Sequence, residues 1–315
     1  MKTVFASLLA ALCFFVSRIP AAEPAEAQEA SSRGAAHLAQ LTAQPWLAYW
    51  KDATLRDIQF VEQKKDLAWP TGLPPAWWAK VTNEGGGSGY IGWDAGSDGK
   101  LIEFAFDASL DVETPDAKAL KGVPALQQFA IPQEGGKAIA SGCVPTSAAS
   151  VVGFWIDHGY PQWRGDVGAR PLLSLAKRIR ARLTMEAIPD KDGYTEDGMT
   201  LAGAMSDDLA HAIQADGDEH HVLIQSRVGP FRYETLQSEV GAGRPVLLSC
   251  VVRLPHKPQL SWGHEVAGIG WAKIGDVCFV GIIDNFYPVK NSATIRWVRS
   301  DAFDSLITIR PAEKK

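Results

Sequence analysis

Residues 140–155 read ASGCVPTSAASVVGFW, and they decide how the rest of the chain is interpreted. Gly142 precedes Cys143, Pro145 follows two residues later, and small and apolar residues complete the run. This pattern predicts a tight turn into a buried helix, because a proline near a helix start removes only an N–H that has no intrahelical partner. Free N–H groups and the positive helix end favour a thiolate, the nucleophilic form of cysteine. The alternative is that Cys143 is a small, inert, buried residue.

The segments after this helix indicate the fold class. The helix should end at residues 158–161, HGYP, because glycine and proline stop it. Residues 172–183 carry apolar side chains at helical spacing with Lys and Arg between them, which predicts an amphipathic helix with a solvated basic face. Strands are expected at 246–253, 264–274 and 277–284. Because helices precede strands, we expect an α+β domain with a C-terminal antiparallel sheet.

A catalytic cysteine needs a base and a group that orients that base. His264 is the best base, since the preceding glycine leaves room for close approach. The orienting group is Asp284 or Asn285, at the end of the strand that follows. If Gly275-Asp276 closes a regular two-residue hairpin, side-chain alternation places His264 on the face of Asn285. A bulge would place it with Asp284 instead.

An oxyanion formed during acyl transfer also needs hydrogen-bond donors. Gln133 stands shortly before Cys143, so its side-chain amide is the first candidate, and Gln127 and Gln128 are alternatives. The backbone N–H of Cys143 would be the second donor.

Together these motifs resemble papain-like cysteine peptidases, specifically the bacteriocin-leader-processing branch and its secreted bacterial relatives. The resemblance spans roughly residues 123–311 and is carried by GCVPTSAA at 142–149, GYP at 159–161, GRPV at 243–246, GHEV at 263–266 and IIDN at 282–285. It implies a papain-like fold with the nucleophile on a central helix. It also implies that Cys143 is the nucleophile, His264 the base, Asp284 the orienting residue and Gln133 the oxyanion donor.

The N-terminus predicts export. Residues 1–27 combine a positive start, an apolar run without charges and an A-x-A-like site, which together are typical of a secretory signal peptide. We therefore expect a secreted or periplasmic protein with no membrane association after cleavage. Of the 4 Cys in the chain, removal of Cys13 leaves three, so one thiol is unpaired if Cys250 and Cys278 are bonded. Three free thiols are equally compatible with the sequence.

Residues between the signal and the cysteine motif divide into two parts. Residues 28–37 are rich in Ala, Ser and Glu and are expected to form a mobile linker before the Trp-rich region 38–120. This region contains a predicted hairpin and more than half of the 11 Trp in the chain, which we interpret as a domain core rather than a sugar-stacking surface. Its similarity to pro-segments of secreted cysteine peptidases suggests that it covers the active-site cleft and is then removed. Residues 121–315 would form the peptidase domain.

Composition narrows the possible partners. Hydrophobic residues make up 46% of the chain and charged residues 21%, an ordinary globular balance. A formal net charge of −5 without a basic run argues against nucleic-acid binding. The histidines and acids around residues 211–221 lack a recognised metal-ligand spacing, and no cofactor is implied. The sequence therefore predicts an exported hydrolase of peptide, isopeptide or amide bonds, with a peptide or protein substrate. The alternatives are an acyl transferase with the same residues, an inactive papain-like binding protein, or a Trp-rich ligand-binding protein.

Overall fold

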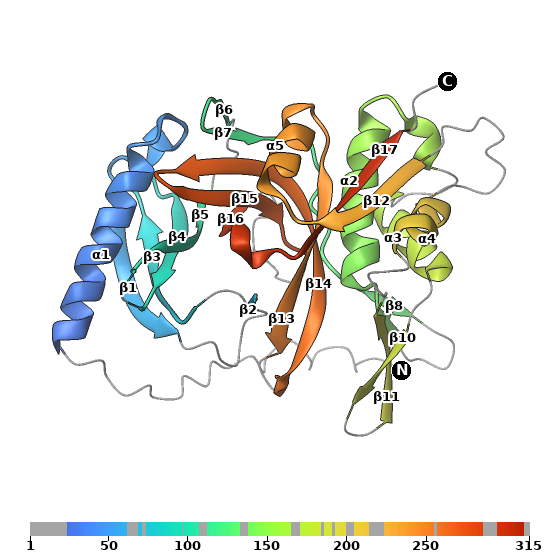
Figure 1. Ribbon diagram of the computed structural model, residues 1–315, viewed down its shortest axis with the longest axis horizontal. Helices are drawn as coiled ribbons and strands as arrows, with labels where there is room; N and C mark the ends of the chain where they lie inside the picture. The colour runs from blue at the N-terminus through green and yellow to red at the C-terminus, as the bar shows by residue number, and fades with distance from the viewer. Residues whose placement is uncertain are drawn as a thin grey trace, which may run out of the picture.

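The computed structural model describes residues 24–61, 69–70, 74–96, 98–106, 112–132, 138–164, 171–183, 186–190, 193–199, 205–213, 224–254, 257–285 and 295–311. Within these ranges the chain is an α+β protein with a large antiparallel sheet and several helices (Figure 1). Its helices are α1 Pro24–Thr42, α2 Cys143–Asp157, α3 Pro171–Arg182, α4 Met205–Ile213 and α5 Tyr233–Gly241, with 3-10 turns η1 Pro45–Trp50, η3 Pro161–Arg164 and η5 Ser300–Ala302.

The main sheet runs in the order β1-β3-β4-β5-β16-β15-β14-β13-β17-β12, and the short strands β2, β6 and β7 pair beside this path. Two further pairs, β8 with β9 and β10 with β11, stand apart from it. The strands are β1 Thr54–Val61, β2 Trp69–Pro70, β3 Ala76–Thr82, β4 Ser88–Asp94, β5 Leu101–Phe106, β6 Glu113–Thr114, β7 Ala117–Ala119, β8 Ala130–Pro132, β9 Ala138–Ala140, β10 Glu186–Asp190, β11 Gly193–Met199, β12 Ile224–Pro230, β13 Val246–Leu254, β14 Lys257–Ile274, β15 Val277–Ile283, β16 Arg296–Arg299 and β17 Ser305–Pro311.

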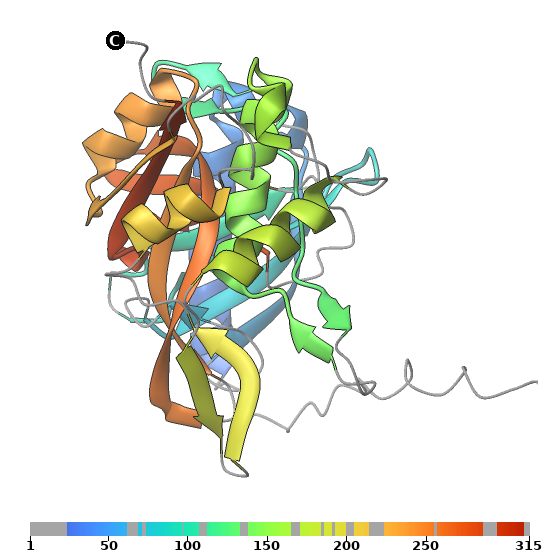
Figure 2. The same cartoon turned by 90° about the vertical axis from the view of Figure 1, so that its right-hand side faces the viewer.

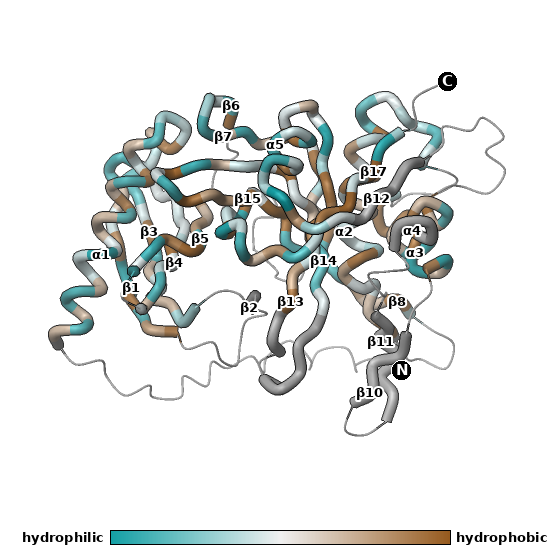
Figure 3. Tube along the Cα trace, in the orientation of Figure 1, coloured by the Kyte–Doolittle hydropathy of each residue, from teal (hydrophilic) through white to brown (hydrophobic). Residues whose placement is uncertain are grey.

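Helices cover both faces of the C-terminal half of this sheet (Figure 2). On one face α2 packs on a core that includes Leu247, Ala267 and Ile307. On the other face α5 contributes Leu236 and Val240 to a second cluster. Alternate residues of β13 and β14 therefore serve opposite cores, as strand geometry requires. Hydrophobic residues concentrate on the central strands, whereas outer turns such as β6–β7 are hydrophilic (Figure 3).

The Trp-rich region 38–120 joins the same sheet as the C-terminal strands. Strand β5 pairs with β16, which places Phe104 opposite Trp297 with parallel rings 6.0 Å apart. Trp50 and Trp93 are fully buried in the core that also contains α2 residues. These tryptophans therefore fill a core, in keeping with the interpretation favoured from sequence. The predicted hairpin is also present, as β4 and β5.

The segment expected to be a linker, residues 28–37, lies inside helix α1. Its alanines favour helix, and the buried residues Ala30, Leu38 and Leu41 fix the helix against the N-terminal strands. At Gly34 an added Cβ would lie 2.7 Å from the Trp93 ring, so the glycine permits close contact between helix and sheet. Sequence composition alone indicated polarity here and did not reveal this packing. Residues 1–23 of the expected signal peptide lie outside the described ranges.

Candidate active site

Cys143 is the first residue of α2 and follows a backbone conformation that only glycine adopts easily. Gly142 has φ 83° and ψ 154°, in a region where a Cβ is strongly disfavoured. The Gly142 carbonyl accepts hydrogen bonds from the Thr146 hydroxyl at 2.6 Å and the Thr146 N–H at 3.3 Å. This turn holds the half-buried Cys143 at the N-terminal end of the helix, where the helix dipole favours a thiolate.

A β-bulge determines which residue meets His264. From the turn at Gly275, β14 pairs regularly with β15 as far as Gly270 and Gly281, and the register then shifts by one residue at Gly268. The extra residue of this bulge is Ile269, between Gly268 and Gly270. Beyond the shift, side-chain alternation places His264 on the face of Asp284 rather than that of Asn285. The structure accordingly has His264 Nε2 donating to Asp284 Oδ1 at 3.2 Å. The bulge considered from sequence is therefore present.

His264 is buried and lies between Asp284 and the Cys143 thiol, with both within hydrogen-bonding reach. Since Nε2 faces Asp284, Nδ1 is the nitrogen left for the sulfur. Burial disfavours the imidazolium, but the hydrogen bonds to Asp284 and Cys143 outweigh it and raise the pKa of His264 to about 10. The environment therefore favours a protonated imidazole, which is the partner that a Cys143 thiolate requires.

Asp284 uses its second carboxylate oxygen for a different partner. Arg296 on β16 donates from Nη1 to Asp284 Oδ2, while its Nε and Nη2 reach the two oxygens of Glu103 at 2.8 and 3.0 Å. Tyr90 donates its hydroxyl proton to Glu103 Oε1. A line of contacts therefore runs from β4 and β5 in the N-terminal region, through Arg296, to Asp284.

Asn285 fastens the start of α2 to the sheet. Its amide Nδ2 lies 3.2 Å from the Cys143 carbonyl and 2.8 Å from the Glu265 carbonyl, and it also donates to the Ser147 hydroxyl. Its own side-chain carbonyl accepts from Gln128 Nε2 at 2.8 Å. The side chain is 2% exposed, so these contacts are shielded from water. The second orienting candidate therefore has a structural role close to the cysteine.

Glu265, next to His264, is a buried carboxyl group with one identified partner among the described residues. Its Oε2 accepts from the Ser249 hydroxyl at 2.5 Å, and its Oε1 has no hydrogen-bond partner in that part of the chain. Burial raises the pKa of Glu265 to about 7, against the opposing effects of Ser249 and His264. A second titratable group thus adjoins the candidate base.

The basic face predicted for α3 is partly buried. Arg180 is 8% exposed, and its Nη1 lies 3.5 Å from the Ser141 carbonyl in the turn before Cys143. Arg178 donates to the backbone carbonyls of Trp163 and Ile213. The expectation of a solvated basic face is therefore wrong for these two arginines, because guanidinium groups can be buried where carbonyl acceptors surround them.

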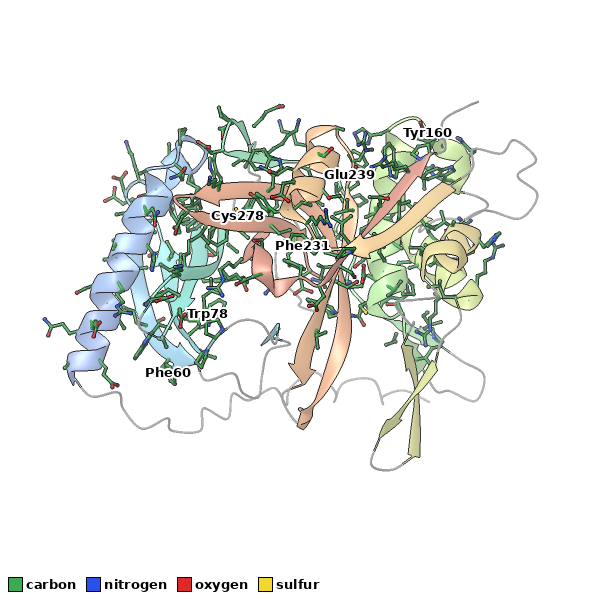
Figure 4. All side chains as sticks on the ribbon, in the orientation of Figure 1. Phe60, Trp78, Tyr160, Phe231, Glu239 and Cys278 are labelled. Carbon is green, nitrogen blue, oxygen red and sulfur yellow. The ribbon has the colours of Figure 1, made fainter. Side chains whose placement is uncertain are left out.

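Cys250 and Cys278 are free thiols and are not neighbours. Strand β14 lies between their strands, and Cys250 pairs with His264 whereas Cys278 pairs with Lys273. The two cysteines are therefore about 30 Å apart along that strand, beyond disulfide reach. Cys250 pairs with His264 across the ladder and is buried, which raises the pKa of its thiol. Cys278 lies near the start of β15, whereas Asp284 follows the last residue of that strand (Figure 4). Cys250 is therefore a buried neighbour of His264, whereas Cys143 is the half-buried thiol in contact with it.

The oxyanion donor expected at Gln133 lies outside the described residues. Of its alternatives, Gln128 is engaged with Asn285 through both its side chain and its backbone N–H, the latter at 3.0 Å. Gln128 therefore braces Asn285. The N–H groups in the first turn of α2 remain as candidate donors, since the first helical N–H groups have no intrahelical acceptor.

Sequence reasoning missed the contribution of Tyr90, Glu103 and Arg296. Glu103 interrupts the apolar run LIEFAF at 101–106, and all six residues of that strand are buried. A charged residue inside such a run is the available signal, because a fully buried carboxylate requires a charged or hydrogen-bonding partner. The identity of that partner depends on the β5–β16 pairing, which is not visible in the sequence.

No protein-family model matches the chain, and no curated protein matches it. Among the helices of the described ranges, none has the length and apolar character needed to cross a bilayer.

Proposed function

We propose that this protein is a cysteine hydrolase that cleaves peptide or related amide bonds, with Cys143 as nucleophile, His264 as base and Asp284 as the residue that orients the base. The observation that carries this proposal is the continuous contact from Cys143 to His264 to Asp284, with the sulfur at a helix N-terminus. Buried Cys–His pairs of this kind generate the nucleophilic thiolate.

The proposed reaction uses these groups in a fixed order. His264 accepts the Cys143 proton, and the thiolate forms a C–S bond to the substrate carbonyl carbon. The resulting oxyanion is stabilised by N–H groups at the start of α2 and by Gln133. The C–N bond then breaks as the imidazolium gives its proton to the leaving amine. His264 next deprotonates a water molecule, which attacks the thioester, and C–S cleavage releases the acid and regenerates the thiolate.

The papain-like architecture and export from the cell belong to the same proposal. An α+β fold in which a buried helix carries the cysteine, and neighbouring antiparallel strands carry the histidine and acid, is compatible with that architecture. Export is supported by the signal-like pattern of residues 1–27. The motif order Cys, His, Asp along the chain supports assignment to papain-like peptidases rather than to another class of thiol enzyme.

The decisive test is the alkylation rate of each cysteine against pH, followed by peptide mass spectrometry on the full chain without its signal. We expect Cys143 to react with iodoacetamide at a pH well below the free-thiol value of about 8.5. Cys278, which is half-buried and lies away from His264, serves as the comparison thiol in the same molecule, and the buried Cys250 should react slowest.

The variants His264→Ala and Asp284→Asn separate an ion pair from a merely accessible thiol. Loss of His264 should return Cys143 to the titration of a free thiol, while leaving the Cys278 rate unchanged. A Cys143 that titrates like Cys278 in the wild-type protein, and is unaffected by His264→Ala, would contradict the proposal. Hydrolysis of a mixed peptide library, blocked by prior alkylation of Cys143, would then identify the substrate class.

A further inference from the structure

We propose that Glu103 and Arg296 form a positioning pair for Asp284, so that the N-terminal strands β4 and β5 are a permanent part of the catalytic unit and are retained in the active protein. This inference rests on the proposed function and extends it. It replaces the expectation, drawn from sequence, that residues 38–120 are a removable pro-segment.

The geometry of Arg296 supports this pairing. Its guanidinium presents two N–H groups to both oxygens of Glu103, at 2.8 and 3.0 Å, and a third to Asp284 Oδ2. Because guanidinium is planar and rigid, the bidentate contact with Glu103 fixes the direction of the remaining N–H. That N–H fixes Oδ2 of Asp284 and leaves Oδ1 facing His264. Glu103 therefore acts on His264 through two intermediate residues.

The network is shielded from water and depends on the N-terminal region. The side chains of Glu103, Arg296 and Asp284 are 0%, 12% and 4% exposed. Buried charges of this kind persist only when each has a partner. Removing residues 38–120 would take away Glu103 and Tyr90, and it would expose the edge of β16 together with Trp297, which is fully buried. Cleavage of this region would therefore remove the carboxylate that holds Arg296 in a bidentate contact beside Asp284.

The charges predict opposite effects of two substitutions on the imidazolium of His264. Neutralising Glu103 removes a negative charge that offsets the Arg296 cation beside Asp284, so the imidazolium should lose its proton at a lower pH. Removing the Arg296 cation leaves the carboxylates uncompensated, so the imidazolium should persist to a higher pH. The other titratable groups near His264, namely Cys143, Cys250, Glu265 and Asp284, are unchanged in both variants.

The experiment compares the reaction rates of Cys143 with iodoacetate and iodoacetamide across pH, in the full chain without its signal. The anionic reagent is favoured while His264 is protonated, so the rate ratio falls as the imidazolium loses its proton. We expect the pH at which the ratio falls to be about one unit lower in Glu103→Gln, and to be higher in Arg296→Met. The double variant Glu103→Gln with Arg296→Met leaves no unpaired charge at these two positions, so it should fold better than the single variants. In this protein the rate ratio should also fall at a higher pH than in the wild type.

The matched control is Glu239→Gln. Glu239 is also a buried glutamate held by two arginines, Arg244 and Arg310, but it lies on α5 (Figure 4). This variant also removes a buried carboxylate from its arginine partners, yet its rate ratio should follow the wild-type curve. Intact mass spectrometry of the alkylated wild-type protein should show that the reactive population retains residues 38–120.

The outcomes separate this inference from the proposed function. A slow Cys143 with no imidazolium signature in the wild-type protein would overturn both. A reactive wild-type Cys143 whose ratio curve is the same in Glu103→Gln as in Glu239→Gln would overturn the inference alone. A reactive population that lacks residues 38–120 would do the same.

Discussion

Substitution of Glu265 by Gln should stabilise the protein in a pH-dependent manner. The Glu265 carboxyl group is 2% exposed, and burial raises its pKa from 4.5 to about 7. Between these values the folded state binds more protons than the unfolded state, so this group's contribution to stability falls as pH rises. The destabilisation is absent below pH 4.5 and complete above pH 7. Glutamine preserves the acceptor for Ser249 and never ionises.

The magnitude follows from the size of the pKa change. A difference of about 2.5 units corresponds to about 3 kcal/mol of unfolding free energy, as an upper bound. We expect Glu265→Gln and the wild-type protein to differ by about 1 kcal/mol or less near pH 4.5, because the added amide gains no partner among the described residues. At pH 8.5 the variant should be more stable by about 2–3 kcal/mol.

Urea unfolding at pH 4.5 and pH 8.5, followed by tryptophan fluorescence, measures the stability difference between the variant and the wild-type protein at each pH. Other titrations common to both proteins cancel in this comparison. Glu239→Gln should show almost no change in its stability difference between these two pH values. Although burial opposes ionisation of Glu239, its bonds to Arg244 and Arg310 lower the pKa of that group, so its contribution to stability is lost only as pH falls below about 4.5. If the stability difference between Glu265→Gln and wild type is the same at pH 4.5 and 8.5, the buried carboxyl group is not protonated near neutrality and the argument fails.

Three further substitutions probe how the fold holds the site. Gly142→Ala should lower the free energy of unfolding by about 1–3 kcal/mol and slow Cys143 alkylation, because the backbone at residue 142 has φ 83°. The control Gly159→Ala, at a backbone φ of 106°, should also lower the free energy of unfolding but leave the alkylation rate unchanged. Asn285→Ala should cost about 2–4 kcal/mol in urea unfolding, since it removes several buried hydrogen bonds, and a loss below about 0.5 kcal/mol would contradict its bracing role. Gly268→Ala should lower the free energy of unfolding by about 1–3 kcal/mol, because its Cβ would lie 2.6 Å from a leucine side chain, and slower alkylation would show that the backbone beside the bulge, between Gly268 and Gly270, positions His264.

Local signals in the sequence predicted much of the framework. The glycine and proline around Cys143 indicated a helix start, and α2 begins at that residue. The strand patterns at 246–253 and 277–284 correspond closely to β13 and β15, and the turn at Gly275 joins β14 to β15. These signals succeed because hydrophobic periodicity and turn chemistry act between residues that are close in the chain.

The partners of the charged side chains depended on contacts between distant segments. Glu103 and Arg296 are 193 residues apart, and only the pairing of β5 with β16 brings them together. The choice between Asp284 and Asn285 depended on one register shift at Gly268. Local sequence located the helix that begins at the cysteine and the strand that precedes the acid. It also located a strand at the histidine, but β14 begins at Lys257, well before the expected start at residue 264. Tertiary structure decided which charges meet, because strand register and burial arise from the packing of the whole sheet rather than from any local stretch.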